Sequence, residues 1–347
     1  MIKPFAALQR GDLVGIIAPA GPAEPQHLAL VEPLFARHGL RVRLYPGCHH
    51  VGGYLAGPDA QRLADLHAAF ADHEVQAIVC LRGGYGSMRL LDRIDVALIQ
   101  RTPKLLVGYS DITALHALLQ RAGVPSLHAP MPASDLVRAG HEDDAEAFFA
   151  LLLGGLARGA VMHAVQAVHA VHAVQAVQSG TPTALRRDGI AEGPLIGGNL
   201  SLVAALCGTP WAFDARGAVL FLEDINEEPY RVDRLLCQLR LAGVLDAASG
   251  FLIGSFTETA SPQSVLAEYL HPLNKPILDG WPAGHGSPNR ALPIGARVRL
   301  DATQATLTLL DDLLVPKWSL AQALRNFDPA RHGGEVMVTA RLGAERE

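Results

Sequence analysis

The stretch Leu105–Thr113 reads LLVGYSDIT, and it decides the fold. Leu105–Gly108 is an apolar run that predicts a buried strand, and Asp111–Ala122 has the spacing of a helix. A strand that gives way to a helix so quickly is typical of α/β domains. The same sharp turn lifts the hydroxyl of Ser110 out of the sheet, toward the strand edge where open α/β folds bind ligands.

Strand and helix patterns also alternate before this stretch. Short apolar runs predict further strands, and apolar residues at helical spacing predict the helices between them. The alternation favours a parallel sheet covered by helices on both faces, built from residues 1–155. The predicted elements, in chain order, are Leu13–Ala18, Gln26–His38, Arg41–Tyr45, Asp59–Asp72 and Ala77–Leu81.

The second half of the chain differs, and we expect a second α/β domain over residues 189–325. Arg297–Leu300 and Ala305–Leu309 predict a hairpin, so this domain is expected to be β-rich with antiparallel character. The chain after Lys317 has few apolar anchors, and residues 326–347 are expected to form a tail.

A low-complexity segment separates the two halves. Residues 160–178 read AVMHAVQAVHAVHAVQAVQ, and a period of three matches neither a helix nor an alternating strand. We interpret residues 156–188 as a linker between domains. His163, His169 and His172 follow the repeat, and nothing nearby supplies an acidic or thiolate partner, so they do not predict a metal site.

The composition excludes several classes of protein. The chain of 347 residues is 49% hydrophobic, and its net charge of -5 lacks the basic excess of nucleic-acid-binding proteins. No stretch reaches the roughly 18 apolar residues of a membrane-spanning helix. The N-terminal apolar run is too short and interrupted for a secretory signal. The cysteines lie far apart, which favours a reducing cytoplasm over a disulfide framework; they are Cys48, Cys80, Cys207 and Cys237.

The first candidate for chemistry is Ser110 itself. A helix that starts beside it supplies free N–H groups and positive potential, and the backbone N–H of Asp111 is placed to hold an oxyanion. The motif is not G-x-S-x-G, because Ile112 replaces the last glycine. In the alternative interpretation, Ser110 or Asp111 only caps the helix.

The second candidate is the glycine-rich turn Leu81–Ser87, which reads LRGGYGS after a buried strand. Its exposed N–H groups could cradle a phosphate or complete an oxyanion hole. The dinucleotide-binding fingerprint lacks its third glycine here. A tight turn that needs positive φ is the structural alternative.

The third candidate combines Glu223, at the end of a predicted strand, with His285 in a Gly/Pro-rich loop. A histidine is the usual general base near neutral pH, and a carboxylate can fix its tautomer. The order Ser, Glu, His is compatible with triad chemistry. Alternatively, Glu223 belongs to a solvated acidic cluster with Asp224, Glu227 and Glu228, and His285 is one of 15 histidines without a special role.

Taken together, these segments resemble the LD-carboxypeptidase family of serine peptidases, which includes muramoyltetrapeptide carboxypeptidases and the microcin C self-immunity peptidase. The similar motifs cover roughly Gly11 to Leu309 in the family's order. They are GDLVGIIAPAGP at Gly11–Pro22, GGYLAGPDAQRLADL at Gly52–Leu66, LRGGYGSMRLL at Leu81–Leu91, VGYSDITALH at Val107–His116, GPLIGGNLSL at Gly193–Leu202, FLEDINEEPYRVDRLL at Phe221–Leu236 and GHGSPNRALPIG at Gly284–Gly295.

The resemblance implies Ser110 as nucleophile, His285 as general base and Glu223 as its orienting carboxylate. It also implies an oxyanion hole from the N–H groups of Asp111 and of a glycine in the Gly83-Gly84 pair, of which we favour Gly84. The implied fold is a flavodoxin-like N-terminal domain and a β-rich C-terminal domain, with the site between them. No metal or cofactor is implied, and a homodimer is expected. The repeat and the tail depart from the family's pattern.

The resemblance further implies cleavage of an L,D peptide bond, with release of terminal D-Ala from a murein tetrapeptide during cytoplasmic wall recycling. A peptidyl-nucleotide toxin is a rival substrate within the family. Gly83, Asn199, Arg231 and Ser287 are candidate substrate-binding residues. A nucleotide-dependent oxidoreductase and a non-catalytic ligand-binding protein stay open as other classes. A metallopeptidase is disfavoured, because no H-E-x-x-H motif occurs.

Overall fold

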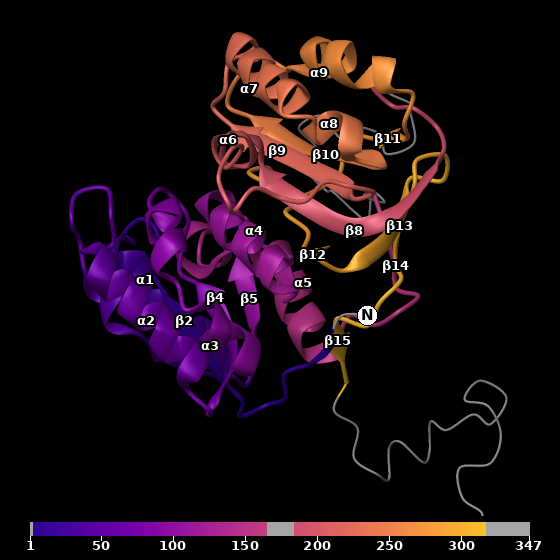
Figure 1. The fold of residues 1–347 in the computed structure, drawn as a ribbon. Helices are drawn as coiled ribbons and strands as arrows, with labels where there is room; N and C mark the ends of the chain where they lie inside the picture. The colour runs from indigo at the N-terminus through magenta and orange to yellow at the C-terminus, as the bar shows by residue number, and fades with distance from the viewer. Residues whose placement is uncertain (1–2, 165–183, 317–347) are drawn as a thin grey trace, which may run out of the picture.

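The computed structural model describes residues 3–164 and 184–316, which form two α/β halves stacked against each other (Figure 1). The helices are α1 Pro25–Arg37, α2 Asp59–Ala71, α3 Val96–Arg101, α4 Thr113–Ala122, α5 Glu142–Gly154, α6 Leu200–Ala205, α7 Pro229–Leu241, α8 Val244–Ala247 and α9 Gln263–Leu270. The strands are β1 Phe5–Ala6, β2 Leu13–Ile17, β3 Arg41–Leu44, β4 Val75–Cys80, β5 Leu105–Gly108, β6 Ser126–His128, β7 Val161–His163, β8 Ile190–Asn199, β9 Val219–Ile225, β10 Gly250–Thr257, β11 Ile277–Leu278, β12 Leu292–Ile294, β13 Arg297–Asp301, β14 Thr306–Leu309 and β15 Leu314–Val315.

The N-terminal half is built on a parallel sheet in the order β3-β2-β4-β5-β6. This is the flavodoxin-like order, in which the second strand lies outside the first. Every residue of β2 and β5 is buried, as expected for strands covered on both faces. α2 packs on β2 and β4, and α4 packs on β6. The flavodoxin-like prediction is confirmed.

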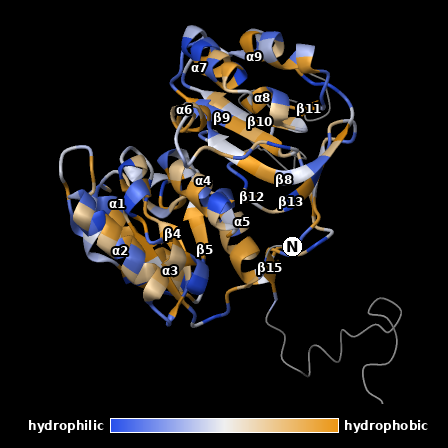
Figure 2. Ribbon diagram, in the orientation of Figure 1, coloured by the Kyte–Doolittle hydropathy of each residue, from blue (hydrophilic) through white to orange (hydrophobic). Residues whose placement is uncertain are grey.

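The C-terminal half contains a seven-stranded sheet in the order β11-β10-β9-β8-β13-β14-β7. The strands β8 to β11 are parallel, whereas β13, β14 and β7 are antiparallel. The predicted hairpin is the pair β13 and β14. Figure 2 shows apolar residues concentrated in the strands of both halves and polar residues on outer helices such as α7. The mixed, β-rich character expected for this half is therefore confirmed.

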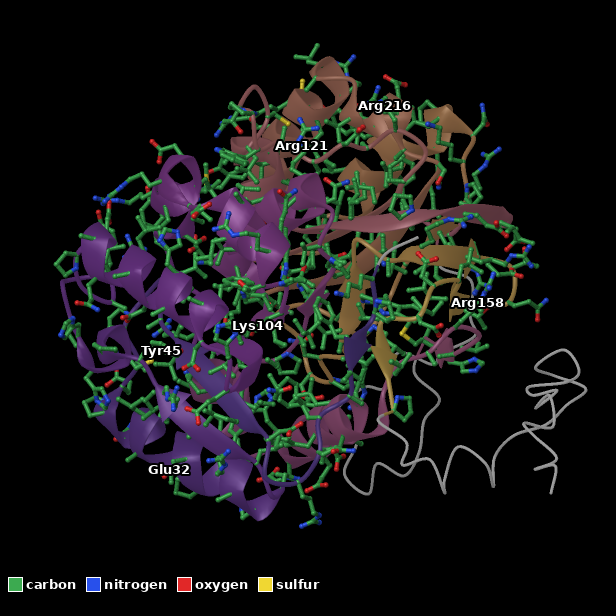
Figure 3. All side chains as sticks on the ribbon, turned by 60° about the horizontal axis from the view of Figure 1, so that its bottom comes forward. Glu32, Tyr45, Lys104, Arg121, Arg158 and Arg216 are labelled. Carbon is green, nitrogen blue, oxygen red and sulfur yellow. The ribbon has the colours of Figure 1, made fainter. Side chains whose placement is uncertain are left out.

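One strand crosses between the halves. β12 lies within the segment assigned to the second domain, yet it pairs antiparallel with β6 at the edge of the N-terminal sheet. A further contact joins the start of α4 to the end of β8, where the Asn199 backbone N–H donates to Thr113 Oγ1 at 3.0 Å. These links bring the carboxyl ends of β5 and β9 to one junction. Two charged residues labelled in Figure 3 lie at the outer surface: Glu32 in the N-terminal half and Arg216 in the C-terminal half.

The segment between the halves is only partly described. β7, at the start of the repeat, pairs with β14, and Arg187 forms an isolated bridge with Ile277. Residues 165–183, including His169 and His172, lie outside the described residues, as does the predicted tail at 326–347. The first strand, β1, pairs with β15 in a short parallel ladder. In residues 3–164 and 184–316, no helix is long and apolar enough to cross a membrane.

Candidate active site

Ser110 occupies a strained turn between β5 and a short 3-10 helix, Ser110–Ile112, that leads into α4. Its φ is 62°, in the left-handed region that residues with a side chain rarely adopt. Such strain persists only where the surroundings enforce it, and it gathers at functional sites. One restraint is His116 of α4, whose Nε2 donates to the carbonyl of Gly108 at 2.8 Å. The predicted elbow is therefore present.

Ser110, His285 and Glu223 form one hydrogen-bonded chain. The distance from His285 Nε2 to Ser110 Oγ is 3.0 Å, and the distance from His285 Nδ1 to Glu223 Oε2 is 2.7 Å. A carboxylate only accepts hydrogen bonds, so Nδ1 carries the proton and Nε2 is free to accept from the serine hydroxyl. Ser110 and His285 are 175 positions apart in the sequence, and Glu223 and His285 are 62 positions apart. The fold thus brings the three side chains into the arrangement of a catalytic triad.

Electrostatics favour the charged state of this carboxylate and the basicity of the histidine. Glu223 is fully buried, which alone would raise its pKa, but the charge and hydrogen bond of His285 hold the pKa well below its usual range. His285 shows the reverse balance. Burial would lower its pKa, and the charge and hydrogen bond of Glu223 raise it above the ordinary value. The pair therefore combines an ionised carboxylate with a strengthened base.

The glycine-rich turn lies directly against the serine. A Cβ added to Gly83 would lie 2.8 Å from Ser110 Cβ and 3.5 Å from the Asp111 backbone nitrogen. The Gly83 carbonyl accepts a hydrogen bond from the Gly21 backbone at 3.0 Å. Because a trans peptide places its N–H opposite its carbonyl, the Gly84 N–H points away from Gly21. Gly84 itself is exposed, with a φ of 115° that glycine adopts readily.

A side chain connects the two parts of this region. Asp111 Oδ2 accepts a hydrogen bond from the Ser87 backbone N–H at 2.8 Å, and the Asp111 carbonyl accepts one from the Ser87 hydroxyl. The elbow and the glycine-rich turn are thus fixed to each other. Burial raises the pKa of the Asp111 carboxyl, and the hydrogen bonds from Ser87 oppose that rise.

Hydrogen bonds of Asn289 fix the loop that carries His285. Asn289 Oδ1 accepts from the Gly284 backbone N–H at 3.0 Å, and the Asn289 N–H donates to Asp144 Oδ1 at the same distance. A Cβ on Gly284 would lie 2.5 Å from Glu223 Oε2, so only glycine lets the loop approach the carboxylate this closely. The first glycine of the Gly284-His285-Gly286 motif is therefore required for steric reasons.

Two residues beside the triad were not singled out from the sequence. The Tyr109 ring lies 4.9 Å from the His285 ring, and its hydroxyl donates to Asp135 Oδ1 at 2.8 Å. His128 Nε2 lies 3.9 Å from Glu223 Oε1, and both groups are fully buried without a hydrogen-bond partner among the described residues. Tyr109 was the easier one to find, because it directly precedes the serine. His128 gives no local signal.

The proposed substrate-binding residues lie in different surroundings. Gly83 faces Ser110, and Ser287 is an exposed residue two positions after His285 that donates to Asp144 Oδ2 at 3.3 Å. Asn199 is buried; its side chain caps α6 and donates to Asp224 Oδ1 at 2.7 Å. Arg231 is exposed on α7 and contacts Tyr230 and Glu227. The structure thus brings Gly83 to the triad, while Asn199 and Arg231 are engaged with other residues. Within the described residues, no cluster of three or more His, Cys, Asp or Glu side chains could hold a metal ion.

Comparisons with known proteins agree with this geometry. The profile of the LD-carboxypeptidase N-terminal domain matches residues 14–129, and that of the C-terminal domain matches residues 192–300. A probable murein peptide carboxypeptidase of Bacillus subtilis is 38% identical over 87% of this chain and 93% of its own length. A murein tetrapeptide carboxypeptidase of Pseudomonas aeruginosa is 32% identical over 84% of this chain and 94% of its own length.

Solved structures are similar over most of the chain. The muramoyltetrapeptide carboxypeptidase of Oxalobacter formigenes is 29% identical with a TM-score of 0.73, covering 87% of this chain and 100% of that one. The microcin C7 self immunity protein MccF has a TM-score of 0.78 at 23% identity, covering 90% of this chain and 100% of that one. At this sequence identity the similarity supports a shared fold and nothing further. The oxidoreductase and pure ligand-binding interpretations are set aside by these matches. The chain belongs to the LD-carboxypeptidase family and is a serine-type carboxypeptidase.

Proposed function

We propose that this enzyme cleaves the L,D peptide bond before the terminal D-alanine of a murein tetrapeptide. The observation that carries the proposal is the hydrogen-bonded chain from Ser110 through His285 to Glu223, with the glycine-rich turn against the serine. The substrate class is supported by relatives named murein peptide and murein tetrapeptide carboxypeptidase.

In the first step, Ser110 Oγ attacks the scissile carbonyl carbon while His285 Nε2 accepts the hydroxyl proton. The ionised Glu223 stabilises the imidazolium that forms and keeps the ring oriented. Negative charge that develops on the carbonyl oxygen is received by the backbone N–H groups of Asp111 and Gly84. The tetrahedral intermediate then collapses, and His285 protonates the departing amine of D-alanine.

The second step releases the peptide. The acyl group remains as an ester on Ser110, and water replaces the departed amine beside His285. His285 Nε2 takes a proton from this water as it attacks the ester, and the proton returns to Ser110 when the ester breaks. The products are a tripeptide and D-alanine. The expected place of the reaction is cytoplasmic wall recycling, and the expected assembly is a homodimer.

Mass spectrometry of a murein tetrapeptide incubated with the enzyme tests the proposal. Wild type should release one D-alanine, and Ser110→Ala should release none at the same protein concentration. Ser264→Ala provides a matched control at an exposed serine of α9, and it should retain activity. Release of D-alanine by Ser110→Ala would refute the assignment of the nucleophile. Cleavage of a peptidyl-nucleotide but not of the tetrapeptide would move the substrate to the rival class.

A further inference from the structure

The ring of Tyr109 packs against His285, the proposed general base. The two ring centroids lie 4.9 Å apart, and the ring planes are inclined by 55°. Tyr109 is buried, and the exposed fraction of the His285 side chain is 12%. Hydrogen bonds hold the two nitrogens of His285, but the tilt of the ring about the line between them is left to packing contacts. Tyr109 supplies such a contact.

The backbone of the elbow determines where the Tyr109 ring begins. Tyr109 has an extended conformation, with a φ of -150° and a ψ of -169°, and it directly precedes Ser110 with its φ of 62°. Because the two residues are consecutive, the turn that places the Ser110 hydroxyl also places the Tyr109 ring. A shift of this turn therefore displaces the nucleophile and the ring together.

The far end of the Tyr109 side chain is anchored by Asp135. The Tyr109 hydroxyl donates to Asp135 Oδ1 at 2.8 Å, and burial raises the pKa of this hydroxyl well above its ordinary value, so it keeps the proton that it donates. Asp135 Oδ2 accepts from the Met131 backbone N–H and from the Ser134 hydroxyl, each at 2.9 Å. These residues belong to or precede the short π-helix Pro132–Leu136, an element often found at functional sites.

Asp135 also adds negative charge near His285. Burial lowers the pKa of the imidazole, whereas the charges of Glu223, Asp224 and Asp135 raise it, in decreasing order of effect. Glu223 and Asp224 lie on β9, and Asp135 comes from the N-terminal half, so acidic groups of both halves act on the base. The nucleophile and the neighbouring phenol are uncharged.

We propose that Tyr109 is a positioning residue for the general base: its ring fixes the tilt of the His285 imidazole, and Asp135 anchors that ring while its carboxylate acts on the imidazole by charge. The proposal rests on the proposed function, because it assigns the role of base to His285. A Tyr109 that only filled the core beside His128, whose ring lies 5.5 Å away, would affect stability but not the reactivity of Ser110 or its pH dependence.

The test measures how fast a fluorophosphonate modifies Ser110 at a series of pH values. This reagent requires an activated serine but no peptide, so the rate does not depend on which peptide the enzyme cleaves. Tyr109→Leu removes the aromatic ring, and Tyr109→Phe keeps the ring but removes the hydroxyl. Asp135→Asn removes the charge at nearly constant volume.

A second tyrosine–carboxylate pair provides matched controls on the outer helices α7 and α9 (Figure 1). Tyr269 of α9 donates to Asp233 Oδ1 of α7 at 2.6 Å. Tyr269→Phe and Asp233→Asn make the same chemical changes at this pair. Both control variants should keep the wild-type labelling rate and the wild-type pH midpoint.

The two parts of the proposal predict different changes. Tyr109→Leu should slow labelling by about ten- to a hundredfold at the optimal pH, because a misplaced base accepts the proton poorly. Tyr109→Phe should lose less, within about tenfold, which is the scale of one hydrogen bond. Asp135→Asn should move the midpoint of the acidic limb to lower pH, since loss of the negative charge lowers the pKa of His285.

A wild-type labelling rate in Tyr109→Leu would overturn the proposal while leaving the triad intact, and so would an unchanged midpoint in Asp135→Asn. If Tyr109→Leu does not fold, the midpoint of Asp135→Asn decides alone. An equal effect in the control variants would also overturn the proposal. Failure of the reagent to label Ser110 in wild type would instead refute the proposed function.

Discussion

Asp111 Oδ2 accepts a hydrogen bond of 2.8 Å from the backbone N–H of Ser87, so the two segments of the proposed oxyanion hole are joined by one carboxylate. Asp111 contributes its own N–H beside Ser110, and Ser87 closes the glycine-rich turn that contains Gly84. The relative position of the two N–H donors depends on this contact. An oxyanion hole works only when its donors are already aimed at the developing charge.

Removal of the Asp111 side chain should therefore slow catalysis without removing either backbone donor. We expect Asp111→Ala to lower kcat by about 10²-fold, within the range for loss of an oxyanion donor. Steady-state kinetics on the tetrapeptide measure this change. Asp111→Asn keeps an oxygen acceptor for Ser87 and should retain more activity than Asp111→Ala. Equal activity of Asp111→Ala and wild type would show that the contact does not align the hole.

Gly83 should tolerate no side chain. A Cβ there would lie 2.8 Å from Ser110 Cβ and 3.0 Å from Ser110 Oγ, so Gly83→Ala must displace the nucleophile or the turn. We expect a loss of about 10²-fold or more in kcat/KM. Gly154→Ala is the matched control, because no atom lies within 4 Å of its added Cβ. The prediction fails if the two alanine variants have the same activity.

The dependence of kcat/KM on pH should report the Glu223–His285 pair. His285 must be neutral to accept the serine proton, and its pKa is raised. Activity should therefore fall as the pH drops through a midpoint above about 6.5, the ordinary histidine value. Glu223→Gln removes the charge that raises the pKa and should move the midpoint to lower pH, with a lower maximal rate. An unchanged midpoint in Glu223→Gln would show that Glu223 does not raise the pKa of His285.

Stability should also depend on pH through Glu223. Its pKa is lowered in the folded state, so ionisation stabilises the fold above the unfolded-state pKa of about 4.3. This contribution is lost as the pH falls below that value toward the lowered folded-state pKa. Urea unfolding of wild type and Glu223→Gln across acidic pH measures it. The free energy of unfolding should fall more steeply with decreasing pH in wild type than in the variant.

His128 should influence the triad from the protein interior. Its Nε2 lies 3.9 Å from Glu223 Oε1, where neither group has another partner among the described residues. Replacement by phenylalanine would remove the polar group nearest to this buried carboxylate oxygen, and we expect it to lower the free energy of unfolding, because the ionised oxygen then has apolar surroundings. We also expect a higher midpoint of the acidic limb, because Glu223 becomes more basic. His128→Gln, which keeps a donor, should be closer to wild type in both measurements.

The sequence alone supports the parallel sheet, the β13–β14 hairpin and the grouping of Ser110 with Glu223 and His285. Local patterns suffice for the first two, since apolar runs and turn residues act over short distances. β12 could not be placed, because a strand of three residues gives little pattern and its pairing with β6 is long-range. The contacts of Asp111, His128 and Asp135 also depend on backbone paths that local patterns do not specify. Distances between distant segments are a property of the folded chain.

A covalent probe can locate the nucleophile directly. A fluorophosphonate, which reacts with activated serines, is incubated with the enzyme, and the modified residue is identified by peptide mass spectrometry. We expect a single adduct on Ser110 in wild type and its loss in His285→Ala, because an unassisted serine hydroxyl is a weak nucleophile. An adduct at another serine, or full labelling of Ser110 in His285→Ala, would contradict this expectation.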